Sequence, residues 1–213
     1  MNRERLDGWC EWGILGLVLA ILVYSPLATG VVRPQDFVIV EWLTVGILLC
    51  WLCRFWVNPK HRLLWPPVCW AVVLFMLYAV GRYLTADIEY VARQEMIKVL
   101  VYGFIFLAVL HNLHKQETTQ VVGTVVIILG MLISLYALYQ FLAGAERVWL
   151  FVRPEVYRQR GSGTFICPNH LAGYLELALP LGLAYTLTGR FTHLAKIFLG
   201  YRSEEHTSEL QSR

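Results

Sequence analysis

The segment Arg160-Gly-Ser-Gly-Thr-Phe-Ile-Cys-Pro-Asn-His-Leu-Ala-Gly-Tyr174 combines residue types that suit phosphate binding, and it lies between two long apolar segments. Arg153 and Arg158 precede it closely. Guanidinium groups donate paired hydrogen bonds to phosphate oxygens. Gly161 and Gly163 allow a tight turn and a close approach of the backbone to a ligand. The pattern therefore predicts a site for a phosphate-bearing lipid headgroup at a membrane surface.

Asn169 and His170 stand where this loop leads into the following apolar helix. Asn169 is typical of a helix N-cap, with Pro168 just outside the helix, and a helix N-terminus also favours an anion. His170 can carry a proton in catalysis or act as a polar hinge, and a single histidine at a helix start is more often structural. Asn169 is therefore a candidate for substrate binding, and His170 is a candidate for catalysis.

Two carboxylates, Glu41 and Glu176, lie inside apolar segments. An ionisable group inside a membrane is a functional candidate by default, although neutral or paired burial in a helix bundle is the alternative. Cys50 and Cys53 have helical spacing but no histidine or acidic neighbour, which favours packing over metal binding, and the five cysteines predict no disulfide framework. We expect neither a metal nor a cofactor.

The composition indicates a polytopic membrane protein, because 57% of the residues are hydrophobic and only 15% are charged. The formal net charge of +3 is too small to suggest nucleic-acid binding. Backbone groups in lipid must be satisfied within the segment, so we expect an all-α transmembrane helix bundle. The predicted spans run from about residue 13 to 28, 37 to 53, 63 to 81, 96 to 109, 121 to 142 and 169 to 187, and a truncated seventh begins near 197.

The C-terminal residues 202–213 break the apolar pattern, and a spanning helix cannot continue through so many polar and charged residues. Their sequence, Arg-Ser-Glu-Glu-His-Thr-Ser-Glu-Leu-Gln-Ser-Arg, matches the in-frame translation of a common sequencing-library adapter. We interpret it as non-native; a genuine polar cytoplasmic tail is the alternative. Residues 1–201 are then expected to be the N-terminal transmembrane part of a longer protein.

The predicted topology has a cytoplasmic N-terminus. Basic residues are equal in number on the two sides, but the first turns favour this orientation, because three basic residues in 54–62 oppose only Arg33. The basic loop 144–168 then lies outside the cytoplasm with residues 82–95, and the inverted topology is the alternative. Residues 82–98 are amphipathic, which predicts an interfacial helix before the fourth span.

The segment from Arg160 to Tyr174, followed by Leu-Glu-Leu-Ala-Leu-Pro-Leu, resembles the start of the core domain of the O-antigen ligase and O-antigen polymerase family. The resemblance places the start of this core near residue 158. Family members are polytopic membrane glycosyltransferases that move a glycan from an undecaprenyl-diphosphate carrier to a lipid or glycan acceptor on the extracytoplasmic face. The family usually has Asn where this chain has Cys167, which argues against a catalytic role for that side chain. A later outer loop of the family, with an arginine and an important histidine, is absent here, so the resemblance implies a fragment that is inactive alone.

The resemblance also implies a place in cell-envelope polysaccharide or lipopolysaccharide synthesis in the bacterial inner membrane, with membrane lipids around the protein. Negative charge grows on the diphosphate as the glycosidic bond breaks, and arginine donors stabilise it. Arg160 matches the family position and is the first candidate for the diphosphate contact. Arg158 and Arg153 are weaker candidates, with snorkelling toward lipid phosphates as the alternative. The alternative function is a polytopic transporter or flippase, which should carry more polar residues within its spans.

Overall fold

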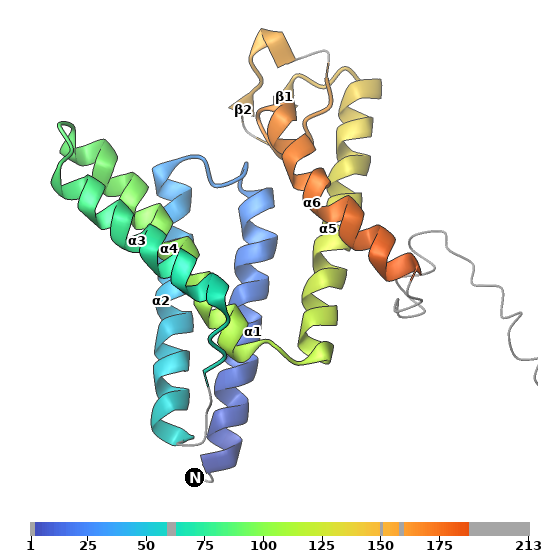
Figure 1. Cartoon of the computed structure of the whole chain (residues 1–213). Coiled ribbons are helices and arrows are strands. Elements are labelled where there is room, and N and C mark those ends of the chain that lie inside the picture. Colours follow the sequence, from blue (N-terminus) through green and yellow to red (C-terminus); the bar gives the residue numbers. More distant parts are fainter. Residues whose placement is uncertain (1–2, 59–62, 150, 158–159, 188–213) are drawn as a thin grey trace, which may run out of the picture. The chain divides into compact units, whose positions relative to one another are not determined.

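The computed structural model describes residues 3–58, 63–149, 151–157 and 160–187, and this part of the chain is mostly α-helix (Figure 1). The helices are α1 (Arg3–Leu27), α2 (Pro34–Val57), α3 (Pro67–Leu84), α4 (Glu89–Asn112), α5 (Gln116–Leu142) and α6 (Pro168–Leu187). By length and composition, the first five are long and apolar enough to cross a membrane. The expectation of a helical, multi-pass membrane protein is confirmed at this level.

The helices coincide with the six predicted spans, and most of them begin earlier than the apolar pattern suggested. The fourth helix, for example, begins at Glu89 and ends at Asn112, whereas its predicted apolar part ran from 96 to 109. Polar residues at the ends of a spanning helix continue the same backbone hydrogen bonding beyond the apolar part. The predicted sixth span is α6, which is not among the five helices that meet the spanning criteria. The predicted seventh span and residues 202–213 lie outside the described residues.

The predicted interfacial helix over residues 82–98 is wrong. Helix α3 continues to Leu84, and α4 begins at Glu89, so only a short turn separates them. Residues 89–98 of the amphipathic stretch are therefore the first turns of α4 itself. A pattern of polar and apolar residues at helical spacing is the same in a separate surface helix and in the first turns of a longer helix, and the short turn after α3 shows that residues 89–98 belong to the longer helix.

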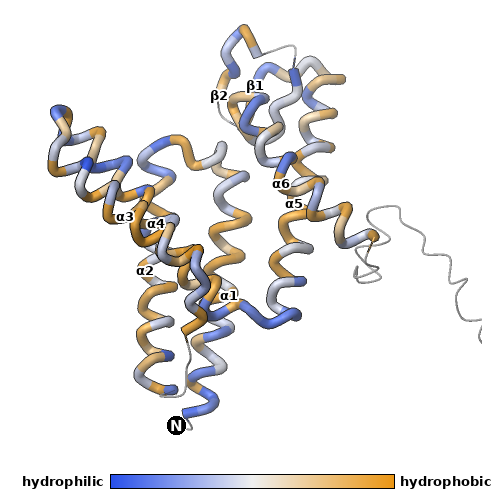
Figure 2. Tube along the Cα trace, viewed as in Figure 1, coloured by the Kyte–Doolittle hydropathy of each residue, from blue (hydrophilic) through white to orange (hydrophobic). Residues whose placement is uncertain are grey.

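Two compact units divide the chain, residues 1–120 and 121–213. In the first unit, α1 packs on α2, α3 packs on α4, and α4 also contacts α2 and α1. Pro34 and Pro67 stand in the first turns of α2 and α3, where a proline costs no intrahelical hydrogen bond. Helices α2 and α3 are largely hydrophobic, as the orange stretches in Figure 2 show, and many of their large apolar side chains are exposed. An outward apolar surface is expected for helices that face lipid.

A buried ion network joins α1, α2 and α4 within the first unit. The Nε atom of Arg54 lies 2.8 Å from Oδ1 of Asp7, and its Nη2 atom lies 3.2 Å from Oε2 of Glu11. Its Nη1 atom donates to Oδ1 of Asn112 at 3.0 Å. Glu11 also pairs with Lys115, whose Nζ atom is 2.5 Å from Oε1. The two cations and two carboxylates balance, which is how a buried arginine (6% exposed) is tolerated.

In the second unit, α5 and α6 pack against each other, and the loop between them folds back onto α5. The core contains Leu129, Ile133, Phe165 and Leu171, with Tyr174 packed beside them. The loop holds a two-stranded antiparallel hairpin, β1 (Arg147–Val148) and β2 (Phe151–Val152), and a short 3-10 helix, η1 (Glu155–Tyr157). This loop carries the residues that the sequence singled out.

Candidate functional site

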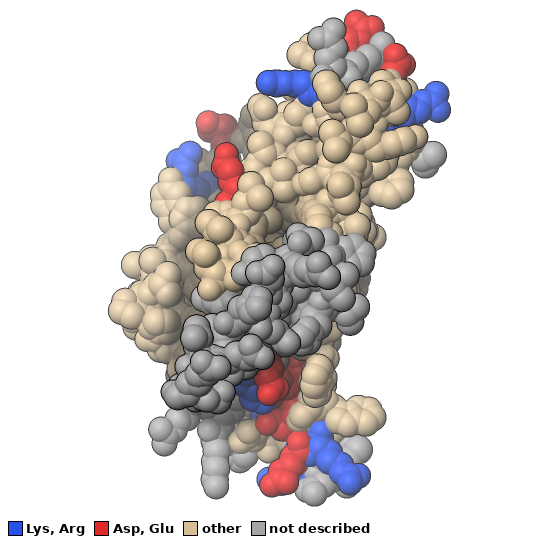
Figure 3. All heavy atoms as spheres, turned by 90° about the vertical axis from the view of Figure 1, so that its right-hand side faces the viewer, with Lys and Arg blue, Asp and Glu red and all other residues tan. Residues whose placement is uncertain are grey.

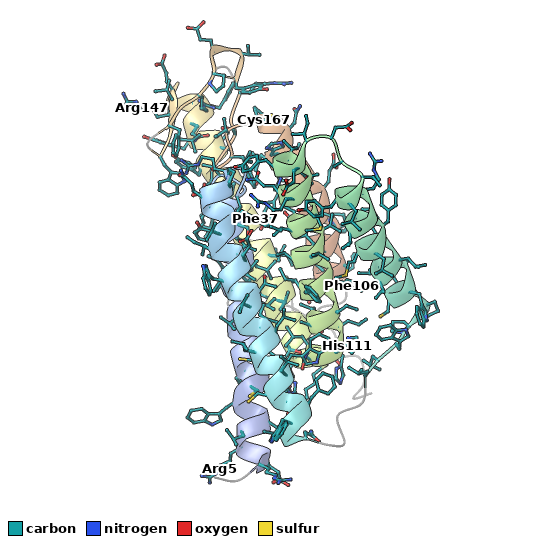
Figure 4. The ribbon with its side chains drawn as sticks, turned by 90° about the vertical axis from the view of Figure 1, so that its left-hand side faces the viewer. Arg5, Phe37, Phe106, His111, Arg147 and Cys167 are labelled. Atoms are coloured by element: carbon teal, nitrogen blue, oxygen red, sulfur yellow. The ribbon has the colours of Figure 1, made fainter. Side chains whose placement is uncertain are left out.

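The candidate site is the loop 143–167 together with the first turn of α6. Figure 4 shows Arg147 and Cys167 in this region, and Figure 3 shows charged side chains of both signs at the loop end of the α5–α6 unit. Arg147 pairs with Val152, and Val148 pairs with Phe151, across the hairpin. Trp149 in the hairpin turn has a φ of 51°, an uncommon value for a residue other than glycine. The ring of Tyr136 on α5 lies 6.3 Å from the ring of Trp149, so the hairpin rests on α5 through aromatic contact.

Gln140, near the end of α5, fixes the glycine-rich part of the loop. Its side chain is completely buried. Its Nε2 atom donates to the carbonyl of Gly163 at 2.8 Å, and its Oε1 atom accepts from the backbone N–H of Ser162 at 3.2 Å. One amide side chain thus satisfies both a donor and an acceptor of the loop backbone, as buried backbone groups require.

Gly161 and Gly163 are needed because the loop backbone lies directly on α5. A Cβ atom at Gly161 would lie 2.3 Å from the carbonyl oxygen of Ala137, and one at Gly163 would lie 2.6 Å from Cγ2 of Ile133. Gly163 also has a φ of 60°, which favours glycine. The sequence predicted a tight turn here, and the structure shows that the turn packs against Ala137 and Ile133 of α5.

Arg153 lies inside the loop, and only 1% of it is exposed. Its Nη1 atom donates to the carbonyl of Arg160 at 2.5 Å and lies 3.5 Å from Oγ of Ser162, and its Nη2 atom donates to the carbonyl of Ala145. Its backbone N–H donates to the carbonyl of Glu146 at 2.9 Å. Arg153 therefore ties the two ends of the loop together. A contact with substrate stays a prediction for Arg153, whose two terminal nitrogens both donate to loop carbonyls.

Arg160 is exposed, in contrast to Arg153. Its backbone is held at both polar groups, because its N–H donates to the carbonyl of Tyr157 at 3.1 Å and its carbonyl accepts from Arg153. Its side chain makes no hydrogen bond or ion pair within the described residues. A fixed backbone with an open guanidinium is the arrangement that a phosphate contact needs. Arg158 lies outside the described residues.

Helix α6 begins one residue earlier than the predicted N-cap implies. Pro168 is its first residue, so Cys167 occupies the N-cap position, and Asn169 and His170 belong to the first turn. The backbone N–H of His170 donates to the carbonyl of Cys167 at 3.1 Å. Asn169 and His170 are both exposed. The prediction of Asn169 as the N-cap is wrong, because Pro168 is accommodated in the first helical turn. The side chain of Asn169 is nevertheless exposed and can contact a ligand.

Several groups near the thiol of Cys167 favour its charged form. The pKa of Cys167 is lowered mainly by a hydrogen bond from the backbone N–H of Asn169, although partial burial opposes the shift. Smaller contributions come from the Tyr157 hydroxyl, the backbone N–H of His170 and the charge of Arg160. The same hydrogen bond to Cys167 raises the pKa of Tyr157. A helix N-terminus and a nearby guanidinium make this position electropositive. A lowered pKa of Cys167 agrees with an electropositive helix start, and anion binding at the start of α6 stays a prediction.

The structure adds residues that sequence reasoning missed. Gln140 and Ser162 organise the loop, and Tyr157 lies against Cys167. A glutamine near the end of an apolar span was the available signal for Gln140, since an amide in that position needs partners. Glu176 is exposed on α6, and among the described residues no group of three or more His, Cys, Asp or Glu side chains is placed to hold a metal ion.

Comparison of the chain with protein-family models, with curated proteins and with solved structures gave no match.

Proposed function

We propose that this chain is part of a multi-pass enzyme of the bacterial inner membrane, similar to O-antigen ligases and polymerases. The reaction is the transfer or polymerisation of a glycan linked to undecaprenyl diphosphate, on the extracytoplasmic face. The observation that carries the proposal is the exposed guanidinium of Arg160, held by its backbone in the segment that resembles the family motif. The five apolar helices support a membrane location.

The role of Arg160 in this proposal is to bind the diphosphate of the donor. Bond cleavage at the anomeric carbon leaves negative charge on the diphosphate, and a guanidinium placed there stabilises the transition state more than the ground state. Asn169 and His170 lie exposed in the first turn of α6, where the helix dipole also favours an anion. The acceptor, a lipid or a glycan, distinguishes a ligase from a polymerase.

Arg153 and Gln140 act as positioning residues in this scheme. Arg153 holds the carbonyl of Arg160, and Gln140 holds the adjacent backbone at Ser162 and Gly163. The arginine that meets the donor therefore projects from a backbone that is already ordered. Pre-ordering removes part of the entropic cost of binding.

Donor binding by this chain is the first test, because it does not require the full reaction. Purified protein in detergent is titrated with an undecaprenyl-diphosphate oligosaccharide, and binding is measured by native mass spectrometry. A charge-assisted hydrogen bond contributes about 1.5–3 kcal/mol, so Arg160→Ala should weaken binding about ten- to a hundredfold. Arg160→Lys should restore it only in part, since an ammonium lacks the planar pair of donors. Arg147→Ala, an exposed arginine of the same loop, is the control and should have little effect.

Glycan transfer in membranes containing the complete gene product is the second test, with expression levels matched. The same loss of about ten- to a hundredfold is expected in rate for Arg160→Ala. Wild-type transfer by Arg160→Ala together with a loss in Arg147→Ala would show that the donor binds elsewhere. Movement of the donor across vesicle membranes without any transfer would favour the transporter or flippase instead.

A further inference from the structure

A pocket that carries charged side chains lies in the first unit, apart from the candidate site in the α5–α6 loop. Its volume is about 440 Å³, within the range of small-molecule sites. It is bounded by the turn between α1 and α2, by the first turns of α2 and by the first turns of α4. Figure 4 marks this region by Phe37, which lines the pocket from α2. The pocket brings one acidic and two basic side chains, with the amide of Gln94, to a wall that is otherwise apolar.

The acidic side chain is Glu41, the carboxylate that the sequence marked inside the second apolar segment. It lies seven residues into α2 from Pro34, roughly 10 Å along the helix at 1.5 Å per residue. It is half-buried, and it makes no hydrogen bond or ion pair within the described residues. A carboxylate at this depth is costly without a partner. The only charged side chains that share its pocket are on α4.

Those side chains are Arg93 and Lys98. Arg93 is exposed, and its guanidinium lies 6.0 Å from the ring centre of Tyr90. The Nζ atom of Lys98 pairs with Glu95 at 2.7 Å, but Glu95 is itself 64% exposed, and an exposed pair of this kind holds its partners weakly. Both cations therefore remain able to meet a ligand, and neither is joined to Glu41.

A pocket that separates an acid on one helix from two bases on another is complementary to a ligand with both charges. We propose that it binds the phosphoethanolamine headgroup of a membrane phospholipid. Glu41 accepts hydrogen bonds from the primary ammonium, and Arg93 and Lys98 bind the phosphate.

The remaining walls suit the apolar part of such a lipid. Phe37, Val38 and Ile97 line the pocket beside the charged groups. Phe37 is fixed from behind by an edge-to-face contact with Tyr102, at 6.0 Å between ring centres. An apolar wall next to a headgroup site, at the end of helices long enough to cross a membrane, matches the boundary between headgroup and acyl chain. A water-soluble zwitterion would make no use of that wall.

The test uses the whole chain in detergent and compares short-chain lipids that differ only in headgroup. Phosphatidylethanolamine, phosphatidylcholine and phosphatidylglycerol are titrated, and bound lipid is measured by native mass spectrometry. Phosphatidylethanolamine should bind about ten- to a hundredfold more tightly than the other two, the range for one charge-assisted hydrogen bond. Only its headgroup offers Glu41 a charged N–H donor, because choline has no N–H and the glycerol hydroxyls of phosphatidylglycerol are neutral donors. Equal binding of the three lipids by the unmodified protein would overturn the proposal without any variant.

Variants assign the groups. Glu41→Gln should remove the preference for phosphatidylethanolamine without weakening the binding of the anionic phosphatidylglycerol, which also shows that the pocket is intact. Arg93→Gln with Lys98→Gln should weaken all three lipids about tenfold or more. Glu4→Gln, an exposed acid in the first turn of α1, is the matched control. A preference for phosphatidylethanolamine that survives in Glu41→Gln would refute the assignment. This result does not bear on Arg160.

Discussion

Replacement of Gln140 by leucine should release the loop that carries Arg160. The side chain is completely buried, and its two polar atoms serve the carbonyl of Gly163 and the N–H of Ser162. Leucine has similar bulk but no polar atom. The substitution therefore leaves one backbone donor and one backbone acceptor without partners while the apolar packing around them changes little.

The magnitude follows from these two lost bonds. An unsatisfied buried polar group costs about 1–3 kcal/mol, so two cost about 2–6 kcal/mol if the loop stays in place. If the loop opens instead, the N–H of Ser162 and the carbonyl of Gly163 form hydrogen bonds with water, so the full cost of two unsatisfied buried groups is not reached. We therefore take about 2 kcal/mol as the loss in local stability, which corresponds to roughly a thirtyfold larger population of the open loop.

Hydrogen exchange followed by mass spectrometry measures that population directly. The peptide containing Ser162 should exchange roughly thirtyfold faster in Gln140→Leu than in the wild type, when closing is fast relative to exchange. Gln140→Glu keeps the acceptor for Ser162 but turns an oxygen toward the carbonyl of Gly163, so it should also open the loop. The matched control is Gln116→Leu, an exposed glutamine at the start of the same helix. Equal exchange in Gln140→Leu and Gln116→Leu would refute this account of the loop.

Three further predictions concern stability and reactivity. Gly161→Ala should lower the free energy of unfolding by about 1–3 kcal/mol, because the new Cβ atom would lie 2.3 Å from the backbone carbonyl oxygen of Ala137. Gly173→Ala, where no atom lies within 4 Å of the new Cβ atom, should instead raise the free energy of unfolding by about 0.5–1 kcal/mol. Thermal unfolding in detergent compares the two variants. Arg54→Ala should cost about 3–5 kcal/mol by removing the buried guanidinium that Asp7, Glu11 and Asn112 share, and the exposed Arg5→Ala should cost almost nothing, so equal melting temperatures would contradict the network. The lowered pKa of Cys167 predicts that its alkylation rate, with the other cysteines replaced by alanine, rises at lower pH than that of an ordinary thiol. Because the pKa of Cys167 is lower in the folded protein than in the unfolded chain, its thiolate stabilises the fold above the unfolded pKa, and this stabilisation is lost as the pH falls through the folded pKa. An alkylation midpoint at or above the pKa of a free thiol would refute the hydrogen bonding described around Cys167.

The sequence by itself determined the helical, membrane-type character of the chain and the approximate position of each helix. Apolar composition over segments near 20 residues leaves the backbone no alternative to helix in lipid. It also marked the loop around Arg160 and the tight turn at Gly161 and Gly163, because glycine permits a tight turn and a guanidinium group suits a phosphate. These are local properties, and they can be read from neighbouring residues.

The tertiary structure decided what the individual side chains do. Arg153 and Arg160 are the same residue type in the same loop, yet one is buried against carbonyl groups and the other is exposed. Glu41 and Arg93, from different helices, line one pocket. Whether a charge is a structural tie or an open ligand group depends on which distant backbone atoms surround it, and spacing along the chain carries no information about those neighbours.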